Sequence, residues 1–445
     1  MAEIRAFRGY RYNLERVAAA DVLTQPYDKI TPAMQEHYYA ASPYNLIPIE
    51  KGRALPNDSG ENNVYTRAAA KLQEWIAADI LARDAVPAIY AYEQDYAIPG
   101  THGRRTRRGF IGIGRVEDYE AGVVFRHERT LAAPKADRLE LLRQTRVQTG
   151  LLFMLYDDAS KQIDAMLEAM AHTKPAVDLK DEYEVTHRLW AITDARSIER
   201  IQSAMAKQRL VIADGHHRYE TALAYRDECR ARDAAKNPDA PYEFAMMALF
   251  NTHGSGLTIL PTHRVIRNIE NFDFERFRSQ AARYFDWYAS PFSSEEERKA
   301  SFAEFTHELE RQRQRHAIGV YAGGGAFYLF VLRRGLDLAQ VLPDVSEAQR
   351  KLDVVLLHKL LIEKCLRITA EAVVAEQHIT YQRDMHEALA AVDRGEAQLA
   401  CLLNPVHVHE VVEIALGGDV MPQKSTDFYP KLLSGLVIFK LDESL

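Results

Sequence analysis

Hydrophobic residues along the chain follow two spacings, one typical of strands and one typical of helices. The apolar runs at 151–156 and 210–213 are short enough for buried strands, and apolar residues at helical spacing follow the second run. The stretch LVIADGHHRYETALAY, residues 210–225, therefore predicts a strand that passes through Asp214 and Gly215 directly into a helix. Strands alternate with helices through this middle part of the chain, which predicts an α/β architecture.

The N-terminal third combines turns, helices and a hairpin. Two Pro-Tyr turns at Pro26 and Pro43 bracket a short helix, and the segments 62–84 and 88–98 predict a longer helix and a strand. The next segment, PGTHGRRTRRGFIGIG, predicts a hairpin with a basic tip made of Arg104, Arg105, Arg107 and Arg108. A solvated turn is the expectation for such a charge run, and a mobile anion clamp is the alternative.

Helices and strands in mixed order predict an α+β region beyond residue 270. The fold class is therefore α/β with α+β additions. We expect three domains: an N-terminal α+β domain over 1–120, an α/β core over 121–268, and a C-terminal α+β domain over 269–445 that returns its MPQKST loop to the core.

Composition narrows the class of protein. A chain of 445 residues with 47% hydrophobic and 27% charged residues is typical of a globular protein with several domains. Its net charge of -7 argues against nucleic acid as the partner. The three cysteines form no CxxC pair, which argues against a disulfide framework and a thiolate zinc site. No signal peptide or membrane-spanning run is apparent, so we expect a cytoplasmic protein without a membrane partner. The oligomeric state stays open.

The DGHHR stretch is the strongest candidate for chemistry. A strand that ends at Asp214-Gly215 presents the free N–H groups of the next helix to an anion, and Arg218 adds a planar fork suited to phosphate. His216 and His217 exchange protons near neutral pH. Asp214 would repel phosphate unless it orients a hydroxyl, accepts a proton or holds Mg²⁺. A helix cap with surface histidines is the plain alternative, and a zinc site completed by His127, His187 or His263 is another.

Three other clusters are candidate site members. The stretch RHERTLAAPKADR places Glu128, a candidate general base, after an apolar run, with Lys135 and Arg138 in the following helix; a surface ion pair is the alternative for Glu128. The stretch MPQKSTDFYPK is a stiff loop of cations and hydroxyls without the glycines of a P-loop, so phosphate recognition and a plain connecting loop both remain open. The stretch PTHR would add His263 and Arg264.

These stretches together resemble a known family. The segments YDKI, SPYN, HERTLAAPKADRLELLR, IADGHHRYETALAY, LPTHRV and GDVMPQKSTDFYPKLLSGL look like the signatures of a widespread bacterial and archaeal family catalogued as a numbered domain of unknown function. The order of elements around DGHHR is also similar to the ParB and sulfiredoxin superfamily, whose free-serine kinases carry the same DGHHR sequence. Two departures, Arg126 and the segment QTGLLF, touch none of the residues assigned to chemistry.

The resemblance implies a phosphotransferase with a ParB/sulfiredoxin-like core, in which L-serine is the acceptor and pyrophosphate, ADP or ATP the donor, with Mg²⁺ as cofactor. A nucleotide-binding switch without transfer and a metal-dependent hydrolase are the alternatives. The predicted catalytic residues are Glu128, Asp214 and His216. The predicted phosphate-binding residues are Gly215, His217, Arg218, Lys424, Ser425, Thr426 and Lys431. The predicted substrate-binding residues are His127, Thr130, Lys135, Arg138, His263 and Arg264.

Overall fold

The fold is that of a computed structural model, which describes residues 1–128, 132–235 and 237–444. The chain forms two compact units. Unit 1 comprises Met1–Thr258 and Pro430–Leu445, and unit 2 comprises Ile259–Tyr429. The expected division at residue 120 does not appear, because strands from both sides of it pair within one sheet. The mixed α/β fold class predicted from the sequence pattern is confirmed.

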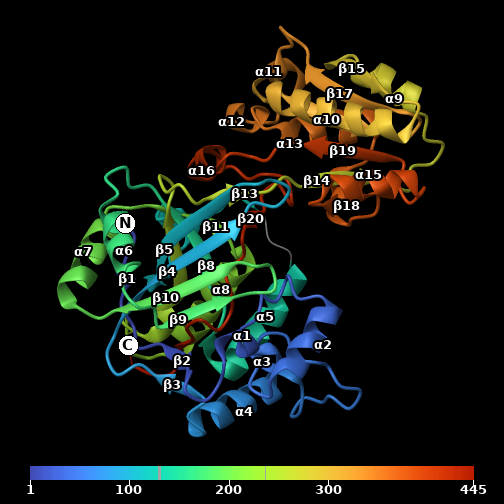
Figure 1. Ribbon diagram of the computed structural model, residues 1–445. Helices are drawn as coiled ribbons and strands as arrows, with labels where there is room; N and C mark the ends of the chain where they lie inside the picture. The colour runs from blue at the N-terminus through green and yellow to red at the C-terminus, as the bar shows by residue number, and fades with distance from the viewer. Residues whose placement is uncertain (129–131, 236, 445) are drawn as a thin grey trace. The chain divides into compact units, whose positions relative to one another are not determined.

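Unit 1 is built on a mixed sheet (Figure 1). The strands in sheet order are β6 (Val124–Phe125), β11 (Leu210–Asp214), β8 (Leu152–Tyr156), β12 (Phe244–Asn251), β5 (Arg104–Arg115), β4 (Ile89–Ala97), β10 (Thr186–Ile192) and β9 (Val177–Lys180), and β1 (Ile4–Arg5) also pairs with β5. The β11–β6 and β12–β8 pairs are parallel and the other pairs are antiparallel. Two small ladders join β2 (Tyr10–Tyr12) to β3 (Leu81–Arg83) and β7 (Val147–Gln148) to β21 (Phe439–Lys440).

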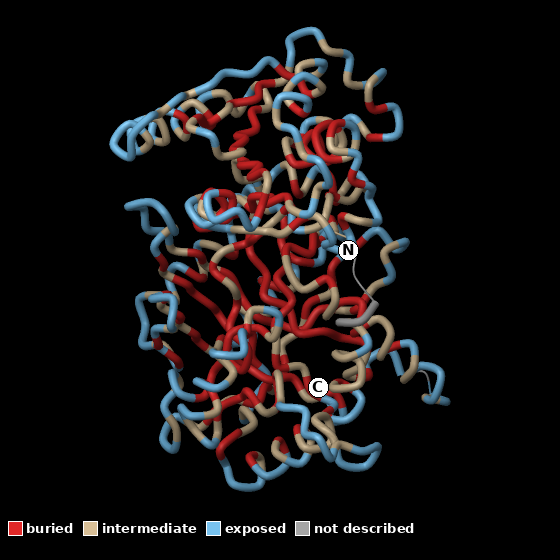
Figure 2. Tube along the Cα trace, turned by 90° about the vertical axis from the view of Figure 1, so that its right-hand side faces the viewer, coloured by how far each residue is buried: buried red, intermediate tan, exposed pale blue. Residues whose placement is uncertain are grey.

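Helices bury the apolar side chains of this sheet. Ile163 and Leu167 from α6 (Gln162–Met170), Ile201 and Met205 from α7 (Ala195–Met205), and Tyr219 from α8 (His216–Arg232) belong to one buried cluster with the strands. Figure 2 shows buried residues gathered in the interior of the trace and exposed residues along its outer turns. The remaining helices of unit 1 are α1 (Ala19–Val22), α2 (Pro32–Ala41), α3 (Ile47–Glu50), α4 (Val64–Ala77) and α5 (Ala132–Thr145), with short 3-10 turns at Tyr119–Ala121 and Pro241–Glu243.

The expected basic hairpin tip is the main difference from the sequence pattern in unit 1. The arginines lie inside β5 rather than in the turn, and Arg107 is 1% exposed. The prediction of a solvated turn is therefore wrong for Arg107. Strand alternation sends Arg105 and Arg107 to one face and the neighbouring arginines to the other.

Unit 2 has its own sheet. The strands in sheet order are β15 (Phe285–Pro291), β17 (Ala326–Leu332), β16 (Ala317–Tyr321), β19 (Leu399–Leu403), β14 (His263–Ile266) and β18 (Ile379–Gln382). Phe305 and Leu309 of α10 (Glu295–Arg311) and Ala388 and Leu389 of α15 (Met385–Asp393) pack on it. The other helices are α9 (Phe274–Ala281), α11 (Leu338–Val341), α12 (Glu347–Arg350), α13 (Asp353–Leu356), a π-helix at Leu357–Cys365, α14 (Ala370–Val374), α16 (Val408–Leu416) and a 3-10 turn at Arg313–Arg315. The two remaining described strands are β13 (Thr258–Ile259) and β20 (Phe428–Tyr429).

Candidate phosphate and substrate site

The site begins where β11 ends. The apolar residues of β11 are buried between β6 and β8, and the strand stops at Asp214. Gly215 then takes a φ of +93°, and α8 begins at His216. A β-carbon at Gly215 would lie 3.3 Å from Leu152 Cδ2, so glycine suits both the backbone angle and the close packing. The first N–H groups of α8 therefore face the end of the strand, as the sequence predicted.

Asp214 is paired with a lysine from the far end of the chain. Lys431 Nζ lies 3.3 Å from Asp214 Oδ1, and the lysine side chain is only 9% exposed. Burial opposes the charged form of Asp214, but Lys431 and Arg218 hold the pKa of this carboxyl well below its usual range. Asp214 is consequently a carboxylate near neutral pH and a weak base. It is better suited to orient a hydroxyl or a cation than to accept a proton.

Two histidines pack against each other at the start of α8. The rings of His127 and His216 meet edge to face with centroids 4.7 Å apart. His127 Nδ1 lies 2.8 Å from the Ile212 carbonyl oxygen, which places the proton on Nδ1. Burial lowers the pKa of His127 to about 4 and that of His216 well below its usual value. Both rings are therefore neutral near pH 7, so His216 does not supply the positive charge that the sequence suggested.

Arg218 supplies buried positive charge beside this helix start. Its Nη1 donates to the Leu151 carbonyl at 3.0 Å, and the guanidinium lies over the Tyr27 ring at 5.3 Å. Its Nη2 is buried and, among the described residues, has no hydrogen-bond partner. The nearest carboxylate oxygens, of Asp28 and Glu50, lie 3.8 and 3.9 Å away. This nitrogen therefore has two carboxylates at ion-pair distance but no hydrogen bond, so an anionic ligand would compete with Asp28 and Glu50 for it.

Glu50 is a buried carboxylate that ties three segments of unit 1 together. It is 2% exposed. Thr149 Oγ1 donates to its Oε2 at 2.6 Å, and Ser434 Oγ and the Tyr27 N–H donate to its Oε1 at 3.0 and 3.2 Å. The network fixes the N-terminal turn, the loop before β8 and the returning C-terminal segment around Arg218.

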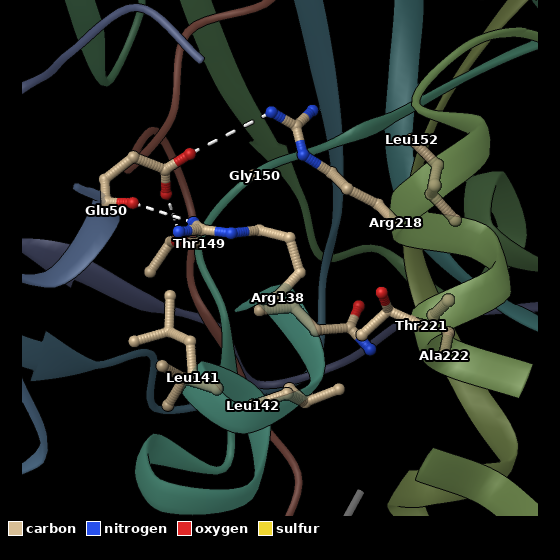
Figure 3. A pocket seen from close by; sticks show the side chains of 13 residues that line it. Glu50, Arg138, Leu141, Leu142, Thr149, Gly150, Leu152, Arg218, Thr221 and Ala222 are labelled. Atoms are coloured by element: carbon tan, nitrogen blue, oxygen red, sulfur yellow. Dashed lines mark hydrogen bonds and ion pairs between the residues drawn. The ribbon is translucent and has the colours of Figure 1, made fainter. Parts of the chain in front are cut away.

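A cavity of about 70 Å³ opens next to Arg218 (Figure 3). Arg138, Arg218 and Glu50 converge on one side of it, while Leu141 and Leu142 lie on the other. Arg138 donates to the Glu50 carbonyl at 2.7 Å. Its guanidinium lies over the Tyr27 ring, 4.3 Å from the ring centroid. The full lining is Glu50, Arg138, Leu141, Leu142, Val147, Gln148, Thr149, Gly150, Leu152, Arg218, Thr221, Ala222 and Ala245. The cavity is therefore amphipathic, with two cations and one anion at its polar side.

The structure groups most of the predicted residues of unit 1. Asp214, Gly215, His216, Arg218 and Lys431 meet around the end of β11, and His127 contacts His216. The His217 carbonyl accepts from Thr221 Oγ1 at 2.8 Å within α8. Glu128 follows His127 and is partly buried. Lys135 was expected to bind substrate, but its Nζ lies 3.6 Å from Glu220 Oε2 of α8 and forms an ion pair with it. Thr130 lies outside the described residues.

The other predicted site residues belong to unit 2. His263 Nδ1 accepts from the Leu403 N–H at 3.2 Å. Arg264 is 1% exposed and donates to the carbonyls of Gln423 and Lys424 at 3.2 and 3.1 Å. Ser425 Oγ donates to the Pro422 carbonyl at 2.5 Å. Arg264 thus orders the loop that carries Lys424, Ser425 and Thr426, and the role of that loop in the site stays a prediction.

Sequence reasoning missed Glu50, Tyr27 and Thr149. Glu50 had one available signal, because it is an acidic residue at the end of the otherwise apolar run LIPIE. Such a residue is buried only with partners, and those partners come from residues 149 and 434, which sequence spacing does not connect to it.

Two general properties of the described residues bear on ligands. No three His, Cys, Asp or Glu side chains in the described ranges are grouped as metal ligands. Within those ranges no helix is long and apolar enough to cross a membrane.

Known proteins show what the chain is similar to. A family model described as "Protein of unknown function (DUF1015)" matches residues 4–355. No curated protein matches the sequence. A conserved hypothetical protein from Pyrococcus furiosus is 13% identical with a TM-score of 0.31, over 69% of this chain and 87% of that one. A free serine kinase in complex with AMP is 12% identical with a TM-score of 0.33, over 71% and 89%. SbnI from Staphylococcus aureus, with a C-terminal truncation, is 11% identical with a TM-score of 0.32, over 73% and 85%. Likenesses of this size do not assign an activity.

Proposed function

Because this chain belongs to the DUF1015 family of proteins of unknown function, we propose its activity from the site itself: transfer of a phosphoryl group from pyrophosphate or a nucleotide to the hydroxyl of a small amino acid, with L-serine as the acceptor. The observation that carries the proposal is the buried Arg218 guanidinium. It lies beside the start of α8, which would bind an anion, and it also lines the cavity that contains Arg138 and Glu50.

The donor phosphates would bind at the start of α8. Lys431 and Arg218 provide fixed positive charge, and the first N–H groups of the helix provide hydrogen bonds and a favourable dipole. Phosphoryl transfer depends mainly on this kind of fixed charge, because negative charge spreads over the phosphoryl oxygens in the transition state. The neutral His127 and His216 would contribute hydrogen bonds rather than charge.

The acceptor amino acid would occupy the cavity. Arg138 and Arg218 suit an α-carboxylate, and Glu50 suits an ammonium group, so the polar side matches a zwitterion. About 10–15 Å³ of such space holds one water, so a cavity of about 70 Å³ takes a molecule of several heavy atoms. This size favours a small amino acid over a large one.

The transfer balances with residues of this chain. The acceptor hydroxyl oxygen forms a bond to the terminal phosphorus while the bond from that phosphorus to the bridging oxygen of the donor breaks. The hydroxyl proton passes to Glu128, and the leaving group, which is phosphate, AMP or ADP according to the donor, keeps the bonding electrons. Asp214, held as a carboxylate, orients the acceptor hydroxyl.

Mg²⁺ fits this chemistry as a cation that needs few protein ligands. It commonly binds one or two carboxylates and takes its other ligands from phosphate oxygens and water. Asp214 would provide the carboxylate, and the ion would neutralise donor charge.

The test is ³¹P NMR of the purified protein with L-serine, Mg²⁺ and, in separate samples, pyrophosphate, ADP and ATP. We expect O-phosphoserine with one donor and a loss of about 10²–10³-fold in rate for Arg218→Ala, the range for removing one transition-state donor. Arg143→Ala is the matched control. Arg143 is an exposed arginine of α5, and it pairs with Glu228 of α8, the helix that also carries Arg218. Donor binding without transfer would identify a binding protein instead, and transfer that survives Arg218→Ala would remove this residue from the site.

A further inference from the structure

Arg107 and Gln94 form a buried polar pair that the activity above does not use directly. They lie opposite each other on β5 and β4 and are 1% and 0% exposed. The Arg107 guanidinium lies over two aromatic rings that also contact each other, 4.7 Å from the Phe153 centroid and 5.0 Å from that of Phe250. Its Nε donates to Gln94 Oε1 at 3.1 Å. Burial lowers the pKa of Arg107 to about 10, so it still carries its charge near neutral pH.

The ends of both side chains also reach the returning C-terminal segment. Arg107 Nη2 donates to the Pro430 carbonyl at 2.6 Å, and Gln94 Nε2 donates to the Lys431 carbonyl at 2.9 Å. These carbonyls stand on either side of the Lys431 α-carbon. Two bonds at these points fix the backbone from which the Lys431 side chain extends to Asp214.

We propose that Arg107 and Gln94 are positioning residues that clamp the backbone of Lys431 and so place its ammonium group beside Asp214 in the donor-phosphate site. A buried arginine is costly unless it is paired and hydrogen-bonded. Arg107 bonds both to Gln94 and to the Pro430 carbonyl, in the segment that carries Lys431. The clamp explains how a lysine from the last residues of the chain is held in place. Its consequence for catalysis rests on the proposed function.

The first test measures the clamp without any ligand. Brief acetylation of the amines, followed by mass spectrometry, reports how accessible each lysine is. We expect Gln94→Met and Arg107→Met to raise the labelling of Lys431 several-fold. Lys440 is the internal control, because its side chain is 11% exposed and also paired with a carboxylate, at 2.5 Å from Asp442. Equal increases at both lysines would indicate general loosening, and no change at Lys431 would exclude the clamp.

A further variant controls for loss of a glutamine that bonds the backbone. Gln398 of unit 2 is half-buried and bonds both the N–H and the carbonyl of Ile269, so Gln398→Met removes backbone bonds made by another glutamine. It should leave the labelling of Lys431 unchanged. An increase in this variant would contradict a specific effect of Gln94.

The second test is a double-mutant cycle with pyrophosphate as the probe, measured by calorimetry. Gln94→Met should weaken binding several-fold in the wild-type background and have no further effect in Lys431→Met, because the clamp acts through Lys431. The same loss in both backgrounds would overturn the proposal. If the wild-type protein does not bind pyrophosphate, the donor assignment fails, while the labelling result still decides the clamp.

Discussion

Replacing Glu50 by Gln should destabilise unit 1 by about 2–4 kcal/mol. The carboxylate accepts three hydrogen bonds, from Thr149, Ser434 and Tyr27, and hydrogen bonds to a charged group contribute roughly 1.5–3 kcal/mol each. Gln keeps the shape and one acceptor oxygen, so part of this energy survives. It loses the negative charge and turns an N–H group toward a hydroxyl donor, which accounts for the expected cost.

Urea unfolding followed by tryptophan fluorescence measures this effect. Trp75 and Trp190 are buried in unit 1, at 0% and 4% exposure, so in a Trp287→Phe background, which removes the tryptophan of unit 2, their signal reports the unfolding of unit 1. Thr149→Val removes one donor and should cost about 1–2 kcal/mol. Glu74→Gln changes an exposed carboxylate on α4 and should stay within about 0.5 kcal/mol. If Glu50→Gln is as mild as Glu74→Gln, the buried network does not hold these three segments together.

Three other predictions follow from single features. Burial lowers the pKa of His127 from 6.5 to about 4, so between these pH values the unfolded chain binds more protons than the folded chain. The free energy of unfolding should therefore fall by about 2 kcal/mol from pH 7 to pH 5. Urea unfolding at the two pH values measures this, and His127→Asn should reduce the dependence. Gly215→Ala should cost about 1–3 kcal/mol and weaken pyrophosphate binding, whereas Gly122→Ala, at a positive φ in open space, should not change binding by calorimetry. Arg264→Met should speed the amide hydrogen exchange of residues 422–426, because it removes the donors to the Gln423 and Lys424 carbonyls; unchanged exchange would refute that anchor.

The turn from β11 into α8 could be predicted from the sequence because its causes are local. A buried apolar run, a glycine and helical spacing lie within a few residues of one another, and the structure places the strand end at Asp214 and the helix start at His216. The last residues of the chain, by contrast, are mostly irregular. Only Phe439–Lys440 forms a strand there, and the residues before it attach through single bridges such as Thr24 with Ser434.

Arg107 shows why the rest could not be predicted. A run of arginines after a turn is usually solvated, and its composition gives no sign of a buried member. The burial of Arg107 depends on Phe153 and Phe250, two rings from separate strands that only the sheet order brings together beside its guanidinium. The partners of Lys431 and Glu50 are equally distant along the chain. Contacts of this kind follow from topology rather than from spacing.

The same topology explains why an acidic residue belongs in a phosphate site. A buried lysine loses hydration, and Asp214 compensates that loss by pairing with Lys431 before any ligand arrives. Arg218 Nη2 makes no hydrogen bond among the described residues, and its carboxylate neighbours Asp28 and Glu50 lie 3.8 and 3.9 Å away, so an arriving phosphate would compete with them for its charge. Asp214 therefore keeps Lys431 buried and ordered. A carboxylate, the neutral His216 and the Arg218 guanidinium can in this way form a preorganised site for an anion, although Arg218 alone of these three side chains carries positive charge.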